Sequence, residues 1–205
     1  MKILSDMKLF KIIIFLLILI FSFQSWSKAD DIADFQIEGM SIGDSALDYF
    51  SKKEIKKFLK TYYPKSKKFY LREGESSKYE IYDSVQFAFK KKDKTYKIYG
   101  LSGSIFYETN IKECLKKMNE IEKELNSIFK ETEIRQYGEA KHAEDKSGES
   151  KQLAQTQYLF SNGGVISITC QDWSEKFKSK YSYTDNLSIA IYSKEYEDFV
   201  RYEAF

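Results

Sequence analysis

The fold is decided near the start of the chain, by the stretch Ile37-Glu38-Gly39-Met40-Ser41-Ile42-Gly43-Asp44-Ser45. A short apolar run ends at Gly39, the chain turns as far as Gly43, and a helix is expected to begin at Asp44 or Ser45. Glycine adopts positive φ at little cost, and Asp or Ser accepts hydrogen bonds from the free N–H groups of a helix start. The pattern predicts a glycine-flanked turn on which helix-then-sheet units are docked.

The segment that follows, 44–62, is predicted to form two short helices that meet at Ser51. Ser51 and Glu54 have the spacing of a capping box. An apolar stripe with helical spacing follows and consists of Ile55, Phe58, Leu59 and Tyr62. Pro64 is expected to end the segment.

Strands are predicted beyond this proline. A short strand at 69–72 precedes a hairpin across 81–99, which turns at 91–94. Residues 100–103 contain two glycines and are expected to break the run. One more strand is predicted at 104–107.

The clearest helix begins at Asn110-Ile111-Lys112-Glu113, a second capping-box pattern. Its apolar positions share one stripe: Ile111, Cys114, Leu115, Met118, Ile121, Leu125, Ile128 and Phe129. Around the turn Ser161-Asn162-Gly163-Gly164 we expect a hairpin of 157–160 and 165–173. The remaining predicted elements are strands at 131–136 and 185–192 and a last helix at 194–202 that Ser193 caps.

Segment 138–155 is rich in Glu, Lys, Ser, Gly and Ala and has almost nothing to bury. This composition predicts an exposed, mobile loop, which is either functional or a solvated insertion. His142, the only histidine of the chain, lies in it. A catalytic triad or zinc site would depend on that one residue, so we expect a solvated side chain and no metal or cofactor.

Strands that are grouped after helices, without strict alternation, favour the α+β class over α/β. The order of elements predicts a single domain at 30–205, with one antiparallel sheet or more packed on amphipathic helices. Two helix-plus-sheet halves, 30–108 and 109–205, are an alternative subdivision of this domain. No repeat is visible at the level of residues.

The first residues have the features of a signal peptide. Lys2, Lys8 and Lys11 precede an apolar run of 12 residues at 12–23, and a more polar segment follows. Ser27 and Ala29 predict cleavage before Asp30, with cleavage after Ser27 as the alternative. The rival interpretation is an N-terminal membrane anchor, but a spanning helix needs about 20 apolar residues. We therefore predict a periplasmic or secreted protein, residues 30–205, that meets the membrane only during export.

The charge of the chain changes once segment 1–29 is removed. That segment has a net charge of +3 and the whole chain +2, so the processed chain has −1. A nearly neutral protein gives no reason to expect nucleic acid as a partner.

The two cysteines are the most informative pair of residues. Cys114 lies on the apolar stripe of the long helix, and Cys170 shares a strand face with Ile166 and Ile168. In an exported protein this placement favours a disulfide, with two buried thiols as the alternative. A redox-active pair is disfavoured because the chain lacks Cys-x-x-Cys.

A weak candidate for a binding surface lies where two predicted strands end and begin. Its residues are Asp172, Trp173, Tyr183, Asp185 and Asn186. If the strands pair, an aromatic face and short polar acceptors converge at one rim of the sheet, as in glycan or peptide sites. Turn chemistry and a Trp that covers the core edge explain the same residues without a ligand.

The stretch at 37–45, together with Asp172-Trp173-Ser174 and Tyr183-Thr184-Asp185-Asn186, resembles small secreted proteins of AT-rich Gram-negative bacteria. That resemblance brings no assigned activity with it. Residues 37–107 also resemble, in element order, the small lipoprotein of the outer-membrane barrel-assembly machine and the β-lactamase inhibitor protein. Those folds are non-catalytic and bind proteins. This chain departs from the lipoprotein in having no Cys at the cleavage site.

The sequence therefore favours a non-catalytic binding or protein-interaction module of the cell envelope. Its partner would be an envelope protein or a glycan or peptide ligand. The alternative is a small periplasmic hydrolase with carboxylates near Asp172 and Asp185, because two carboxylates suffice for such chemistry. No catalytic residue is assigned.

Overall fold

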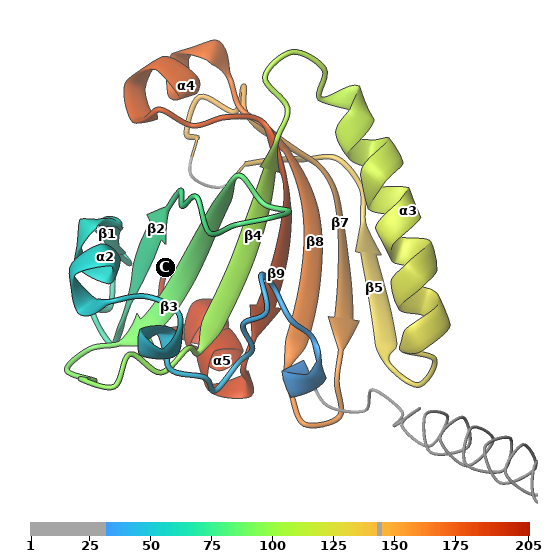
Figure 1. The fold of residues 1–205 in the computed structure, drawn as a ribbon. Coiled ribbons are helices and arrows are strands. Elements are labelled where there is room, and N and C mark those ends of the chain that lie inside the picture. Colours follow the sequence, from blue (N-terminus) through green and yellow to red (C-terminus); the bar gives the residue numbers. More distant parts are fainter. Residues whose placement is uncertain (1–31, 143–144) are drawn as a thin grey trace, which may run out of the picture. The chain divides into compact units, whose positions relative to one another are not determined.

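The computed structural model describes residues 32–142 and 145–205, so the predicted signal peptide lies outside the described residues. The strands form one nine-stranded antiparallel sheet in the order β1-β2-β3-β4-β9-β8-β7-β5, with β6 paired to β7 (Figure 1). The predicted α+β class is confirmed. The strands are β1 (Leu59–Tyr62), β2 (Phe69–Gly74), β3 (Ser84–Lys90), β4 (Gly100–Phe106), β5 (Glu133–Tyr137), β6 (Ala140–Lys141), β7 (Lys151–Leu159), β8 (Val165–Asp172) and β9 (Asn186–Tyr192).

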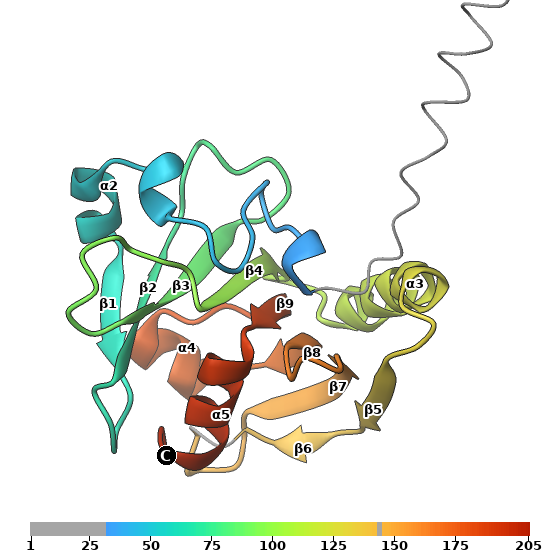
Figure 2. The same cartoon turned by 90° about the horizontal axis from the view of Figure 1, so that it is seen from below.

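The helices are distributed over both faces of this sheet (Figure 2). They are η1 (Ile32–Asp34), η2 (Ala46–Asp48), α2 (Lys52–Lys57), α3 (Lys112–Ile128), α4 (Glu175–Tyr181) and α5 (Lys194–Tyr202). We name the two sides of the sheet the α3 face and the α5 face. Segment 32–50, α2 and α3 cover the α3 face, whereas α4 and α5 lie on the α5 face.

Two sets of elements, each a helix followed by strands, contribute to the single sheet. α2 precedes the meander β1 to β4, and α3 precedes the meander that ends in β8 and β9. The last strands of the two meanders, β4 and β9, pair along their full length. The strands therefore form one sheet, in which pairing β4 with β9 satisfies backbone groups that two free edges would expose.

The predicted disulfide is confirmed, and it joins helix α3 to the sheet. Cys114 of α3 and Cys170 of β8 have sulfur atoms 2.02 Å apart and Cα atoms 6.0 Å apart. Both residues are fully buried on the α3 face. Met118 and Leu125 continue the buried stripe of α3, but Leu115 and Ile128 are partly exposed, so the stripe is narrower than predicted.

The turn at 37–45 has the predicted form. Ile37 and Met40 exchange two backbone hydrogen bonds of 3.0 Å, with Glu38 and Gly39 at φ of 51° and 73°. A non-glycine residue at positive φ is unfavourable, and the contacts of Glu38 explain its presence. Its carboxylate accepts from the backbone N–H groups of residues 80, 81 and 82 at 2.8–2.9 Å. The turn thereby holds the loop that leads into β3.

The predicted second helix at 51–62 is confirmed in its first part and wrong in its last residues. Ser51 and Glu54 do form the capping box, but α2 ends at Lys57 and Leu59–Tyr62 is an edge strand. The chain turns at Phe58, whose ring stacks on Phe87 at a centroid distance of 6.1 Å. Tertiary packing of one aromatic ring therefore overrides the helical spacing of the residues that follow it.

The glycines at 100 and 103 were expected to break the run of strands, yet Gly100 begins β4 and Gly103 lies inside it. The return strand predicted at 95–99 is absent and only an isolated bridge joins Lys97 to Ser45. A Cβ on Gly100 would lie 2.4 Å from the ring of Tyr196, and one on Gly103 would lie 2.4 Å from that of Tyr82. These glycines make room for aromatic rings that lie flat on the sheet.

Segment 138–155 is more ordered than its composition predicts. It contains β6 and the first five residues of β7. Two further differences are that α4 has no counterpart in the predictions, and that α3 begins without a side-chain cap from Asn110. Within the described ranges, no helix has the length and apolarity to cross a membrane.

Candidate functional site

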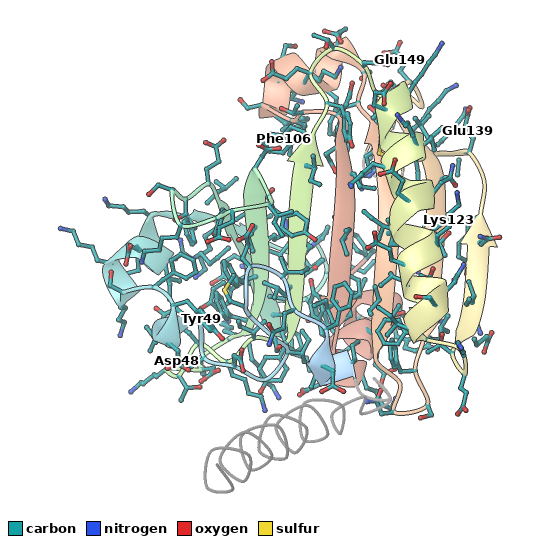
Figure 3. The ribbon with its side chains drawn as sticks, turned by 45° about the vertical axis from the view of Figure 1, so that its right-hand side comes forward. Asp48, Tyr49, Phe106, Lys123, Glu139 and Glu149 are labelled. Atoms are coloured by element: carbon teal, nitrogen blue, oxygen red, sulfur yellow. A yellow bond between two sulfur atoms is a disulfide. The ribbon has the colours of Figure 1, made fainter. Side chains whose placement is uncertain are left out.

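The α5 face is only partly covered, and a cavity of about 320 Å³ remains between α4 and α5. We call it the groove. Its floor is the middle of the sheet, its upper wall is the aromatic group beside α4, and its lower wall is formed by α5 and the end of the chain. The side chains of Figure 3 show Phe106 at the α4 end of β4, where the upper wall begins.

The floor is built from polar residues that alternate with core residues along the strands. Ser104 of β4 pairs with Ser84 of β3 on one side and with Ser188 of β9 on the other. One step along, Ser102 pairs with Gln86. Because neighbours in register point to the same face, these side chains form adjoining polar rows on the α5 face.

Several groups of the floor have no partner within the described part of the chain. The hydroxyls of Ser102, Ser104 and Ser188 make no hydrogen bond to the described residues, in contrast to Gln86, which donates to Glu73 at 2.9 Å. Asn186 is 8 % exposed and donates its amide N–H to the Thr184 carbonyl at 2.8 Å. Its Oδ1 is buried and has no partner among those residues. A buried acceptor without a partner costs about 1–3 kcal/mol.

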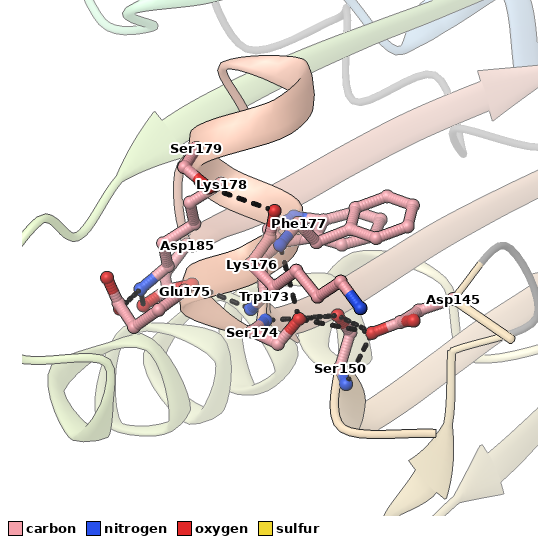
Figure 4. Close-up of polar contacts among 10 residues, drawn as sticks. All are labelled: Asp145, Ser150, Trp173, Ser174, Glu175, Lys176, Phe177, Lys178, Ser179 and Asp185. Atoms are coloured by element: carbon pink, nitrogen blue, oxygen red, sulfur yellow. Dashed lines mark hydrogen bonds and ion pairs between the residues drawn. The ribbon is translucent and has the colours of Figure 1, made fainter. Parts of the chain in front are cut away.

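The upper wall is centred on Trp173. Its ring lies 4.1 Å from that of His142 and 4.6 Å from that of Tyr183, measured between centroids. Phe177 of α4 stacks on its other side at 5.2 Å, as Figure 4 shows. Trp173 is almost fully buried by these neighbours, whereas Tyr183 is 37 % exposed and faces the groove with part of its ring.

A carboxylate holds this wall in place. Asp185 accepts from the Trp173 backbone N–H at 2.7 Å and from Lys178 Nζ at 2.8 Å (Figure 4). Asp185 is 5 % exposed, so its charge is compensated by the ion pair rather than by bulk solvent. The interaction ties α4 to the start of β9, which keeps Trp173 and Tyr183 together.

A second carboxylate anchors the turn that precedes β7. Asp145 accepts from the N–H and hydroxyl of Ser150 at 3.0 and 2.6 Å and from the Ser174 hydroxyl at 3.2 Å. Ser174 is also the N-cap of α4, so the network joins the turn to that helix (Figure 4). Hydrogen bonds from Ser150 and Ser147 keep the pKa of Asp145 well below its usual range. This network is the physical reason why part of 138–155 is ordered.

His142 differs from the solvated side chain that was predicted. It is partly buried against Trp173, and burial lowers its pKa although the charge of Asp145 opposes the shift. The imidazole is therefore neutral at pH 7 and serves as an uncharged polar group at the groove.

The lower wall is aromatic as well. Tyr192 and Tyr196 stand 5.1 Å apart between ring centroids, and the hydroxyl of Tyr196 hydrogen-bonds to that of Tyr63. Burial raises the pKa of both Tyr192 and Tyr196, so their phenols stay protonated and neutral. Val200 and Phe205 complete this wall.

The residues of the predicted binding surface differ in where they lie relative to the groove. Trp173, Tyr183 and Asn186 line the groove, whereas Asp172 and Asp185 do not. Asp172 lies on the opposite strand face from Gln171, and burial with the nearby Asp185 charge raises its pKa. The serines of the floor were missed, although a signal was present in the alternation of Ser102 and Ser104 with apolar residues.

The groove carries little charge. Glu73 is the one charged side chain among the described residues that line it, apart from the neutral His142. The chemistry of the groove is therefore that of hydroxyls, amides and aromatic rings. In three comparisons, the chain matched no protein-family model, no curated protein and no solved structure.

Proposed function

We propose that the protein is an exported, non-catalytic binding module and that the groove holds an uncharged, hydroxyl-rich ligand such as an oligosaccharide. The observation that carries the proposal is the row of unpartnered hydroxyls at Ser102, Ser104 and Ser188 between two aromatic walls. Pockets of this kind use apolar walls for affinity and a few placed polar groups for orientation.

Sugars fit this arrangement for two reasons. A serine hydroxyl both donates and accepts, as does each hydroxyl of a sugar, so the two can pair in either direction. The C–H face of a pyranose ring is apolar and packs against aromatic rings such as Tyr183. Anionic ligands fit poorly, because no Lys or Arg is found among the described lining residues and Glu73 would repel them.

A peptide is the competing ligand. The backbone groups of β4 and β9 are already paired in the sheet, so the floor offers only side chains to an extended peptide. Peptides that bind to sheets gain most of their affinity from main-chain hydrogen bonds at a free edge. The groove lies over the middle of the sheet, which favours the saccharide.

The hydrolase alternative loses the carboxylates that were suggested for it. Asp185 is occupied by Trp173 and Lys178, and neither Asp172 nor Asp185 lines the groove. Glycoside hydrolysis requires two carboxyl groups on either side of the scissile bond. Glu73 alone does not meet that requirement.

Export is part of the proposal. It is supported by the predicted signal peptide and by a disulfide that links residues 56 positions apart. Disulfides persist in oxidising compartments and are rare in the cytosol.

Tryptophan fluorescence provides a direct test, because Trp173 is the only tryptophan of a chain that begins at Asp30. Neutral oligosaccharides are titrated into residues 30–205, and we expect a saturable change in emission. Ser188→Leu, which fills the floor, should weaken the response at least tenfold. Ser127→Leu, on the exposed side of α3, should leave it unchanged.

Other outcomes would decide against the proposal. A response to pooled peptides that is absent with saccharides would assign a peptide ligand to the same groove. Release of shorter saccharides during incubation would show a hydrolase. A response that survives Ser188→Leu would place the ligand outside the groove.

A further inference from the structure

Positive charge is concentrated in one part of a chain that is nearly neutral overall. Residues 52–97 contain fourteen lysines and one arginine against six acidic residues, whereas the whole chain has a net charge of only +2. The structure brings six of these lysines together at the β1 end of the sheet, and we call them the lysine surface. They are Lys60, Lys65, Lys67, Lys91, Lys92 and Lys94, all of them exposed.

The lysine surface combines strand β1 with two neighbouring turns. Lys60 lies on β1, which is the edge strand of the sheet (Figure 1). The turn before β2 and the turn after β3 are held side by side, because the Lys91 N–H donates to the Lys68 carbonyl at 2.7 Å. Residues that lie thirty positions apart in sequence thereby share one corner of the molecule.

The acidic groups near this corner are already engaged. Glu203 pairs with Lys68 at 2.9 Å and Glu195 pairs with Lys90 at 2.6 Å. Asp93 accepts from the backbone N–H groups of Thr95 and Lys97. Within the described ranges, none of the six lysines of the surface has an acidic partner within ion-pair distance. Their positive charge is uncompensated.

Aromatic and apolar side chains accompany the charges. The Lys60 ammonium lies 4.6 Å from the ring centroid of Tyr62 and 4.4 Å from that of Tyr70. Lys67 approaches Tyr62 at 5.9 Å. Tyr62 is 38 % exposed and shares a strand face with Lys60, whereas Leu59, 67 % exposed, lies on the other face of the same edge strand. Lysines around an exposed tyrosine are typical of surfaces that meet the headgroup region of a bilayer.

From this juxtaposition we infer that the lysine surface docks the folded protein on an anionic phospholipid bilayer. Lysine is a compact point charge on a flexible stem, which suits attraction to many headgroups rather than bidentate recognition of one phosphate. Tyr62 would lie at headgroup level while the lysines face the lipid charges. The inference is independent of the groove and adds a membrane contact that lasts beyond export.

Vesicle binding tests the inference. Residues 30–205 are used, because they retain every described contact and exclude the apolar run at 12–23, which would itself bind lipid. Vesicles of phosphatidylcholine are compared with vesicles of the same lipid mixed with phosphatidylglycerol in a sedimentation assay. We expect binding to the anionic vesicles only, and its loss at high salt, because screening shortens the reach of the charges.

A matched pair of triple variants separates the surface from net charge. Lys60→Glu, Lys67→Glu and Lys91→Glu together should weaken binding at least tenfold. Lys112→Glu, Lys123→Glu and Lys130→Glu change the net charge equally but lie on and after α3, where Figure 3 shows Lys123. They should reduce binding less than threefold. If the first variant does not unfold cooperatively, the corresponding Lys→Gln variant replaces it and should show a smaller loss in the same direction.

Three results would overturn the inference. Equal binding to neutral vesicles would show that charge is not involved. Equal losses in the two triple variants would show that net charge, rather than this surface, decides. Binding to soluble heparin without binding to anionic vesicles would assign the surface to a soluble polyanion. None of these results bears on saccharide binding in the groove, which Trp173 reports separately.

Discussion

The disulfide between Cys114 and Cys170 fixes helix α3 on strand β8 of the sheet. Replacing both residues with alanine should lower the free energy of unfolding by roughly 3–4 kcal/mol, since the bridge closes a loop of 56 residues. For a domain of this size that corresponds to a melting temperature lower by about 10 °C.

Mass spectrometry of the unreduced protein should find the peptides of Cys114 and Cys170 linked. Thiols that react freely with alkylating reagents after denaturation, without a reductant, would contradict the bridge. Met118 and Ile168 would then hold α3 on the sheet without it, because both are buried in the same layer.

The carboxylate of Glu38, in the turn at 37–45, contributes to the stability of the folded protein. Glu38 accepts three backbone N–H groups, and these lower its pKa although partial burial opposes the shift. Glu38→Gln should therefore destabilise the protein by about 1–2 kcal/mol at pH 7. Gln keeps the length of the side chain, so the loss reports the charge and not the backbone conformation.

The pH dependence follows from the sign of that shift. A carboxyl with a lowered pKa stabilises the fold above its ordinary pKa, near 4.5, and the contribution disappears as pH falls through the folded value. The difference in melting temperature between the wild type and Glu38→Gln should shrink toward acidic pH. A constant difference from pH 7 to pH 3 would show that the carboxylate charge is not responsible.

The sequence predicted those parts of the fold that depend on local patterns. The capping box at Ser51, the hairpin at 161–164, the stripe of α3 and the inward direction of both cysteines all follow from spacing within a few residues. These features arise from periodicity and turn chemistry, which neighbouring residues determine.

The errors occur where a distant ring or carboxylate decides the local structure. Phe58 ends α2 because Phe87, far along the chain, receives its ring. Gly100 begins a strand instead of breaking one, and Tyr196 occupies the space of its missing Cβ. The groove was predicted only at Trp173, Tyr183 and Asn186, because its floor depends on the register between β4 and β9, which no local pattern specifies.

His142 should titrate at an unusually low pH. Burial against Trp173 lowers the pKa of its imidazole below the ordinary 6.5. Because a protonated imidazole quenches indole emission at contact distance, the fluorescence of Trp173 should fall as the histidine is protonated. The midpoint should lie below pH 6.5, and His142→Phe should abolish the transition while leaving the ring contact. A midpoint at or above 6.5 would show that burial against Trp173 does not control the pKa of His142.

Gly103 offers the sharpest test of how the α3 face is packed, because it alternates along β4 with Ser102 and Ser104 of the opposite face. A Cβ there would lie 2.4 Å from the ring of Tyr82, so Gly103→Ala should destabilise the protein by about 1–3 kcal/mol through overpacking. Gly138→Ala is the matched control, since a Cβ at that position meets nothing within 4 Å and φ is not positive. Urea denaturation of both variants measures the difference, and Gly138→Ala should be within about 0.5 kcal/mol of the wild type.

Tyr82→Ala removes the ring that the new Cβ would meet. If Gly103→Ala costs no free energy of unfolding in the Tyr82→Ala protein, the clash with that ring is the cause of the loss in the wild type. If the two glycine variants unfold at the same urea concentration, β4 does not carry Tyr82 on its surface as described.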